Sequence, residues 1–187
     1  GYYDIELGNY NIVSVVEDIT MSVLEYIKNK GIELIFDTDT EEEIIACDPD
    51  KIERIILNLL SNAIKYTRPD GKIIVNINSD KENVYISVKD TGIGMPKQKL
   101  NKIFNRYEQI DNKLTKSFNG SGIGLSLVKS LVEMHKGKIT VESKENEGSK
   151  FTITLPKKRI NNEHIKNTNL TKSRVEKCNI EFSDIYN

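Results

Sequence analysis

The segment "PDKIERIILNLLSNAIKY", residues 49–66, has a pattern from which the fold can be predicted. Asp48 before it can act as a helix N-cap, and Pro49 suits the first helical position. At about 100° per residue its apolar side chains fall on one stripe. The stripe consists of Ile52, Ile55, Ile56, Leu59, Leu60 and Ala63. We therefore expect an amphipathic helix over 49–66 whose stripe packs against a core.

The opposite side of this helix is polar. Asn58, Asn62, Lys65 and Tyr66 share roughly one third of its circumference. Asparagine is a mediocre helix former because its side chain competes for backbone hydrogen bonds. A solvated face is the ordinary interpretation of such a pair of asparagines. The alternative is a metal-phosphate site, with an amide oxygen for Mg²⁺, a lysine for phosphate and an aromatic ring for a base.

The rest of the chain predicts a sheet with further helices. Strand patterns occupy 32–38, 43–48, 72–80, 83–90, 138–145 and 150–156. Helical patterns occupy 11–30, a short segment near 97–104, and 122–135. This order favours a two-layer α+β sandwich, with an antiparallel-rich sheet that carries helices on one face. The other face of the sheet is then either exposed or covered by a partner.

Two glycine motifs flank a long polar segment. "DTGIGMP" (90–96) follows a strand with a carboxylate that can accept a hydrogen bond from an exocyclic amine, and its glycines let the backbone approach a flat ligand. The polar segment, 105–121, has a length typical of lids, binding loops or disorder. "GSGIGLSLVK" (120–129) then opens a helix, but it matches neither the dinucleotide fingerprint nor the Walker loop. Only the combination of the motifs is specific.

Composition narrows the class of protein. The 187 residues are 37% hydrophobic and 29% charged, which is ordinary for one soluble domain with tails. A net charge of -1 gives no broad basic field, so we expect no nucleic-acid partner. Cys47 and Cys178 form neither a disulfide framework nor, with His135 and His164, a metal motif, which favours a reducing compartment. There is no signal peptide or run of ~18 apolar residues, so we expect no export signal or membrane span in this piece. Because the start lacks an initiator Met, we expect a piece of a longer protein.

Taken together, "NLLSNAIKY", "DTGIGMP", "IFNRYEQID" and "GSGIGLSLVK" resemble the N, G1, F and G2 boxes of the ATP-binding domain of sensor histidine kinases, in the family's order. The resemblance extends from about residue 5 to 156. It implies a Bergerat fold, in which a mixed, mostly antiparallel sheet of about five strands carries three main helices on one face. ATP would lie between the helix layer and a lid. The resemblance also implies a cytoplasmic domain of a bacterial membrane-bound kinase.

The resemblance implies roles for residues in each box. In the N box, Asn62 would bind Mg²⁺, Asn58 would contact the phosphate end, Lys65 would contact phosphate and Tyr66 would flank the adenine; we expect Asn58, Asn62 and Lys65 to be the catalytic residues. In the G1 box, Asp90 would accept the adenine amino group, with Gly92, Ile93 and Gly94 around the base. The remaining nucleotide contacts would come from Tyr107, Gly120, Ser121, Gly122, Ile123, Gly124 and Leu125. Phe104 would anchor the lid, and Arg106, Lys113 and Lys116 are cations that could reach the γ-phosphate.

The phosphate acceptor is expected elsewhere. The family phosphorylates a histidine on a two-helix dimerisation domain of the same protein and passes the group to an aspartate of a response regulator receiver domain. No helix here carries a His followed by an acidic residue: we expect His135 to be structural and His164 to be solvated. The fragment should therefore bind ATP and ADP without autophosphorylating. It could be a monomer, whereas the full-length protein should be a homodimer.

Three functions remain open at this point. The first is the histidine kinase domain, the second a Bergerat-fold ATPase or an anti-sigma type serine kinase, and the third a degenerate binding module. The hydrolases of this fold commonly have a glutamate four residues before the Mg²⁺-binding asparagine, where this chain has Asn58. An amide cannot accept a proton at neutral pH, which favours phosphoryl transfer. We expect a linker or short strand over 1–10, the ATP-binding domain over 11–156, and a polar tail over 157–187 with either disorder or a short strand near 178–186.

Overall fold

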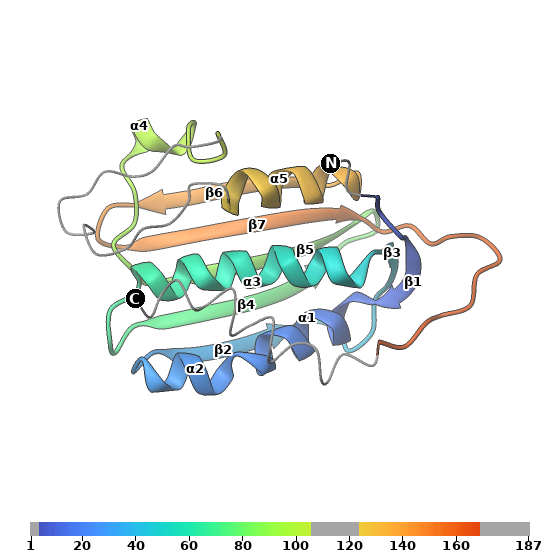
Figure 1. Cartoon of the computed structure of the whole chain (residues 1–187), viewed down its shortest axis with the longest axis horizontal. Helices are drawn as coiled ribbons and strands as arrows, with labels where there is room; N and C mark the ends of the chain where they lie inside the picture. The colour runs from blue at the N-terminus through green and yellow to red at the C-terminus, as the bar shows by residue number, and fades with distance from the viewer. Residues whose placement is uncertain (1–3, 106–123, 169–187) are drawn as a thin grey trace.

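A computed structural model describes residues 4–105 and 124–168 of the chain. Helices and strands alternate in an α+β order (Figure 1). The strands are β1 Gly8–Asn11, β2 Glu33–Thr38, β3 Ile44–Cys47, β4 Lys72–Ser79, β5 Asn83–Asp90, β6 Lys138–Lys144 and β7 Gly148–Pro156. The helices are α1 Ile12–Ser22, α2 Leu24–Asn29, α3 Pro49–Tyr66, α4 Lys97–Leu100 and α5 Gly124–Met134. The bounds of α3 are those predicted from its cap and its apolar stripe.

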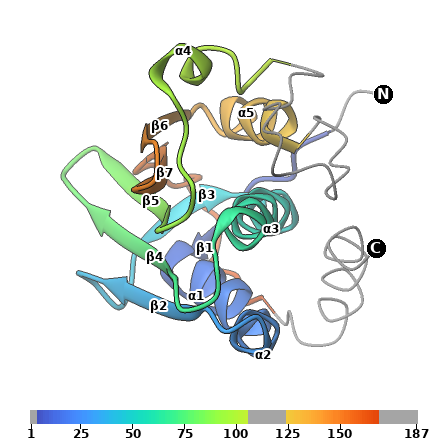
Figure 2. The ribbon, with the colours of Figure 1, turned by 90° about the vertical axis from the view of Figure 1, so that its left-hand side faces the viewer.

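The main sheet has five strands in the order β2-β4-β5-β7-β6. β2 pairs with β4 in parallel, and the other neighbours pair antiparallel, so the sheet is mixed. Alternating residues of β4, β5 and β7 are buried on the face covered by the helices, as strand geometry requires. Figure 2 shows α1, α2, α3 and α5 on one side of the sheet. The predicted two-layer architecture is confirmed.

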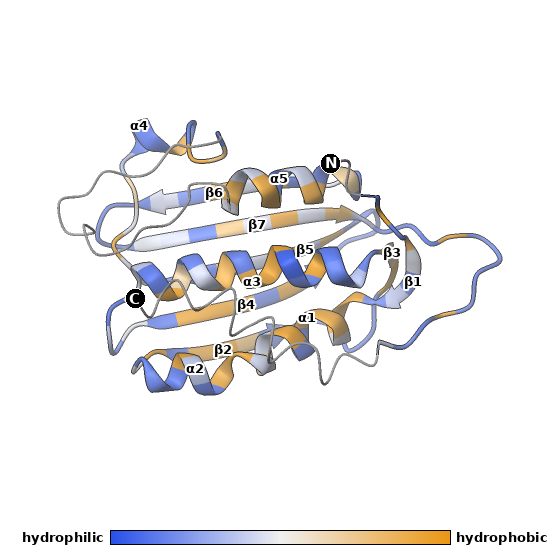
Figure 3. Cartoon of the chain, in the orientation of Figure 1, coloured by the Kyte–Doolittle hydropathy of each residue, from blue (hydrophilic) through white to orange (hydrophobic). Residues whose placement is uncertain are grey.

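The core lies between the helices and the sheet. The apolar stripe of α3 is buried, from Ile52 to Ala63, together with Ile73, Val75 and Ile77 of β4. Both hydropathy colours alternate along α3 in Figure 3, as expected of an amphipathic helix. Burial of these aliphatic side chains is the main favourable term in folding, at roughly 25 cal/mol per Å² of apolar surface.

The single helix expected over 11–30 is instead two helices, α1 and α2, which are separated at Val23. The hydroxyls of Thr20 and Ser22 donate to backbone carbonyls of the preceding turn at 2.8 and 2.6 Å. Such bonds compete with the helix ladder and bend helices. Because the apolar periodicity continues through the break, the pattern alone predicted one helix.

A second, two-stranded sheet joins β1 to β3, which the strand patterns did not predict. The buried side chain of Asn9 in β1 connects this sheet to the segment after β7: it donates to Ile160 O at 2.9 Å and accepts from Ile160 N at 2.8 Å. Ile165 forms a parallel bridge with Asn9. The first part of the expected polar tail, up to residue 168, is thus hydrogen-bonded to the start of the domain.

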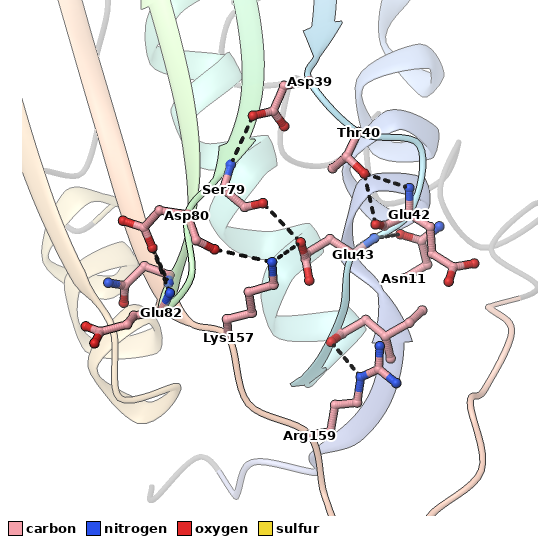
Figure 4. A network of polar contacts seen from close by, with 12 residues as sticks. Asn11, Asp39, Thr40, Glu42, Glu43, Ser79, Asp80, Glu82, Lys157 and Arg159 are labelled. Carbon is pink, nitrogen blue, oxygen red and sulfur yellow. Dashed lines mark hydrogen bonds and ion pairs between the residues drawn. The ribbon is translucent and has the colours of Figure 1, made fainter.

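A polar network closes the sheet end that holds the β4–β5 turn (Figure 4). Glu43, before β3, accepts from Ser79 Oγ at 3.0 Å and pairs with Lys157 Nζ at 2.8 Å. Lys157 also donates to Asp80 O at 3.2 Å. Glu43 is only 8% exposed, so this ion pair is less screened than one on the surface. The network ties β3, the β4–β5 turn and the end of β7 together.

Candidate functional site

The polar face of α3 is held by a well-defined helix start. Asp48 Oδ1 accepts from the backbone N–H groups of Asp50 and Lys51 at 3.1 and 3.2 Å, which satisfies two of the unpaired donors at the N-terminus. The side chains expected to bind a ligand are all half-buried. They are Asn58, Asn62, Lys65 and Tyr66. A fully solvated face, which was the ordinary alternative, would have exposed side chains. These four side chains are instead partly covered by neighbouring elements.

Asn58 brings the first box into contact with the last. Its Nδ2 donates to Arg54 O at 2.8 Å, which orients the amide. A Cβ atom placed on Gly124 would lie 2.9 Å from Asn58 Oδ1. A side chain on the first residue of α5 would therefore displace the Asn58 amide, which glycine leaves in place. The structure thus places Gly124 beside Asn58, and the role of Gly124 at the phosphates stays a prediction.

Asp90 lies at the end of β5 and is only 5% exposed. Its Oδ1 accepts from Gly92 N–H at 2.8 Å, and the backbone N–H of Ser149 also donates to the carboxyl group. Burial raises its pKa to about 6, and the two N–H donors oppose that shift. No lysine or arginine of residues 4–105 and 124–168 forms an ion pair with it. A buried carboxylate with spare acceptor capacity suits an uncharged donor such as an amine of a base.

The glycines after Asp90 allow its loop to pack against α3 and against the β6–β7 turn. A Cβ on Gly92 would overlap Tyr66 O, and Ile93 N–H donates to that same carbonyl at 3.2 Å. Gly94 has φ +62, and a Cβ there would overlap Lys144 O. The loop therefore brings Asp90 next to the end of α3, where Tyr66 lies.

Gly94 offers a quantitative check on this packing. Gly94→Ala is expected to destabilise the domain by about 3 kcal/mol, because left-handed strain of about 1–2 kcal/mol adds to a steric overlap. Gly31→Ala is the matched control: Gly31 has φ +71, but the nearest atom to its Cβ position is Pro69 Cβ at 3.5 Å. It should lose only the strain. Urea unfolding of both variants measures the difference, and equal losses would contradict the packing described.

Lys65 and Tyr66 form a cation–aromatic pair at the end of α3. Lys65 Nζ lies 5.4 Å from the centroid of the Tyr66 ring. Burial lowers the pKa of the Lys65 ammonium and raises the pKa of the Tyr66 hydroxyl, because each charged form loses hydration. A phosphate group beside Lys65 would favour its charged form.

Some of the other predicted positions lie in the described residues, and the rest lie outside them. Phe104 packs edge-to-face on the buried Phe151, with ring centroids 6.4 Å apart, and its role as a lid anchor stays a prediction. Leu125 is half-buried against the core. Tyr107, Gly120, Ser121, Gly122 and Ile123, together with the cations Arg106, Lys113 and Lys116, lie outside the described residues.

The sequence patterns missed Gly148 and Ser149 as neighbours of the site. Gly148 has φ +104, and a Cβ on it would overlap Asp90 O. The β5–β7 register pairs Asp90 with Ser149, which explains how a turn distant in sequence reaches the carboxylate. The only signal was the glycine in the "NEGS" turn, which marks a turn without indicating what it contacts.

His135 is a buried structural side chain, as expected. It is 5% exposed, and both ring nitrogens are hydrogen-bonded, to Leu131 O and Asp48 N at 2.8 and 3.1 Å. Burial lowers its pKa. His164 is exposed.

The described ranges, 4–105 and 124–168, contain neither a clustered metal site nor a membrane-spanning helix. No three His, Cys, Asp or Glu side chains in them are grouped so that they could hold a metal ion. None of their helices combines the length and the apolar character needed to span a bilayer.

The family model described as "Histidine kinase-, DNA gyrase B-, and HSP90-like ATPase" matches residues 47–159. Histidine kinase P4 of Formosa agariphila is 37% identical over 82% of this chain and 12% of its own length. The sensor histidine kinase WalK of Bacillus subtilis is 37% identical over 72% of this chain and 22% of its own length. The chain thus spans a small part of the curated relatives that it matches.

Solved structures agree with these matches. The catalytic domain of histidine kinase ThkA superposes with a TM-score of 0.72 at 28% identity, over 82% of this chain and 99% of that domain. The same kinase in complex with the response regulator protein TrrA gives a TM-score of 0.69 at 27% identity, over 82% of this chain and 42% of that one. The chain belongs to the family of histidine kinase-, DNA gyrase B- and HSP90-like ATPases, and within it to the catalytic ATPase domains of histidine kinases.

Proposed function

We propose that this domain binds Mg²⁺-ATP at the end of α3 and donates the γ-phosphoryl group to a histidine on a dimerisation domain of the same protein. The observation that supports this most is the convergence of two glycine motifs on the polar face of α3. Asn58 touches the position of a side chain on Gly124, and the Asp90–Gly94 loop packs on Tyr66 O. Residues distant in sequence thereby form one wall with amide, carboxylate and cationic groups.

The adenine would bind at the β5 end of this wall. The ionised Asp90 would accept the exocyclic amino group, and Gly92, Ile93 and Gly94 would leave room for the ring. Tyr66 would flank the base. The burial of Asp90 supports this role, because a hydrogen bond that excludes water discriminates more strongly than an exposed one.

The phosphates would extend along the polar face of α3 towards Gly124. Lys65 would balance phosphate charge, and Asn58 would contact the phosphate end. Asn62 offers one amide oxygen, which suits Mg²⁺, an ion that takes few protein ligands and completes its shell with phosphate and water. Mg²⁺ held there would neutralise charge on the transferring group. Contacts from Tyr107, Gly120, Ser121, Gly122, Ile123 and Leu125 remain predictions.

The chemistry would be an in-line displacement. A lone pair of the acceptor imidazole forms a bond to the γ-phosphorus, while the bond from that phosphorus to the β–γ bridging oxygen breaks and the electron pair leaves with ADP. The domain would contribute orientation and charge screening. Asn58 cannot act as a general base, and its Nδ2 is engaged with Arg54 O. Transfer to an external nucleophile is therefore favoured over hydrolysis.

The setting of the whole protein follows from this proposal. We expect a cytoplasmic position in a membrane-bound sensor kinase, a homodimer for the full-length protein, and an aspartate of a response regulator as the next acceptor. Residues 11–156 would form the ATP-binding unit. The complex of ThkA with TrrA supports a regulator as the partner.

A reconstituted transfer tests the proposal. Calorimetry should detect binding of ADP, and of ATP with Mg²⁺. Added to the dimerisation segment of the full-length protein and γ-labelled ATP, the domain should form an acid-labile, base-stable phosphohistidine, with negligible steady-state ATP hydrolysis when alone. Absence of nucleotide binding would overturn the proposal. Steady hydrolysis that Asn58→Ala abolishes would instead favour an ATPase.

A further inference from the structure

The helices α3 and α5 lie side by side and run antiparallel (Figures 1 and 2). They touch through polar or close contacts at two separate places. At one end, Asp48 N–H donates to His135 Nε2; at the other, Asn58 Oδ1 abuts Gly124. These contacts are ten positions apart on one chain segment and eleven on the other, or about 15–17 Å at 1.5 Å per residue. The stretches of α3 and α5 between the two contacts are thus nearly equal in length, and the helices contact each other at both ends of these stretches.

The contact at His135 is directional and allows one tautomer. Nε2 accepts from Asp48 N–H at 3.1 Å, so the proton is on Nδ1, which donates to Leu131 O at 2.8 Å. The ring is buried, and its orientation is therefore fixed by two bonds. Asp48 is fixed as well, because its carboxylate caps α3 and its Oδ2 accepts from Glu6 N–H at 2.9 Å.

The contact at Gly124 depends on the axial position of α5. A Cβ on Gly124 would lie 2.9 Å from Asn58 Oδ1, so a side chain there would displace the Asn58 amide. Between the two ends, the buried residues of α5 are mostly aliphatic, such as Val128 and Leu131. Aliphatic packing is weakly directional, and packed helices can slide past each other by 1–2 Å. The His135–Asp48 hydrogen bond at the far end is directional and therefore resists such a slide.

We propose that His135 and Asp48 are positioning residues that set the axial register of α5 on α3 and so place the Gly124 end of α5 against Asn58. The inference rests on the proposed function, since Asn58 and Gly124 are assigned there to the phosphate end of the nucleotide. Misplacement of binding groups by about 1 Å can cost up to 100-fold in activity. The His135–Asp48 hydrogen bond at one end of the helix pair would in this way affect nucleotide binding at the other end.

Two near-isosteric variants distinguish the effect of losing the His135–Asp48 hydrogen bond from the effect of a general loss of stability. His135→Gln places an amide oxygen close to Nε2 and can accept from Asp48 N–H. His135→Asn has its amide close to Nδ1, so it can bond to Leu131 O but cannot reach Asp48. ADP affinity should fall about tenfold in His135→Asn and stay within about twofold of wild type in His135→Gln. Amide NMR signals of Asn58 and Gly124 should shift in the Asn variant only.

Glu43→Gln is the control variant that should lower stability without changing the His135–Asp48 hydrogen bond. It removes the ion pair with Lys157, and the Glu43 side chain bonds to Ser79 rather than to either helix. It should leave ADP affinity unchanged. The inference is overturned if His135→Gln and His135→Asn lose affinity equally, if neither does, or if Glu43→Gln matches the Asn variant. A wild-type domain that binds no ADP would refute the proposed function, while the NMR shifts at Asn58 and Gly124 would still decide the register.

Discussion

Asp90→Asn is expected to lower ADP affinity by about 10- to 100-fold and to stabilise the domain at pH 7.5. An ionised acceptor contributes about 1.5–3 kcal/mol to a hydrogen bond, and the adenine amine would lose that acceptor. The domain itself should gain up to about 3 kcal/mol, because the pKa of Asp90 is raised from 3.8 to about 6 and each pKa unit is worth about 1.4 kcal/mol. Calorimetry and urea unfolding measure the two effects separately.

The pH dependence gives the sign of the stability effect. The pKa of Asp90 is higher in the folded state, so the stabilisation from its protonation is complete below the unfolded value of 3.8 and is lost as pH rises through about 6. The stability of Asp90→Asn should therefore exceed that of wild type above pH 6 and converge with it towards pH 4. The difference in ADP affinity should narrow over the same range, because a protonated carboxyl group is, like the Asn amide, an uncharged acceptor.

Asp37→Asn is the control for this pair of effects. Asp37 is an exposed carboxylate on β2, and its replacement should alter neither ADP affinity nor stability by more than about 0.5 kcal/mol. Phosphate groups of ADP also titrate near neutral pH, but they do so equally for wild type and variant. Unchanged ADP affinity in Asp90→Asn would contradict the assignment of the adenine site.

Local chemistry made most of the secondary structure predictable. α3 has its predicted bounds because Asp48 caps it, Pro49 starts it and its apolar stripe faces a single layer. The β4–β5 hairpin follows from alternation about a short polar turn. The break at Val23 was missed because it depends on hydroxyl hydrogen bonds, which leave the apolar period unchanged. The pairing of β1 with β3 is non-local and has no sequence signature.

The site was only partly predictable, because local sequence patterns place residues on one face of a helix but do not show what that face contacts. The helical period alone places Asn58, Asn62, Lys65 and Tyr66 on one face, but it cannot tell a solvated face from a binding wall. The resemblance added Asp90 and Gly124, and the structure brings both to α3. Gly148 and Ser149 reach Asp90 only through the register of β5 on β7, which is set by the packing of the whole sheet.

Asn62→Ala is expected to reduce phosphohistidine formation by 100-fold or more while leaving the domain fully folded. Loss of the amide oxygen would remove the one protein ligand proposed for Mg²⁺, and charge stabilisation by a metal is worth several kcal/mol in the transition state. Alanine is a better helix former than asparagine by up to about 0.7 kcal/mol, so stability should not fall. Transfer to the dimerisation segment, measured with ATP over a range of Mg²⁺ concentrations, reports the effect.

The distinguishing outcome is the response to Mg²⁺ and not the loss of rate alone. Wild type should bind ATP more tightly as Mg²⁺ is added, whereas Asn62→Ala should bind ATP and ADP with similar affinity at all Mg²⁺ concentrations. Ser61→Ala is the matched control, since Ser61 is the half-buried neighbour on α3 and is assigned no ligand. If ATP binding by Asn62→Ala still strengthened with added Mg²⁺, Asn62 would not be the metal ligand. The ion would then be held by other groups, such as phosphate and water.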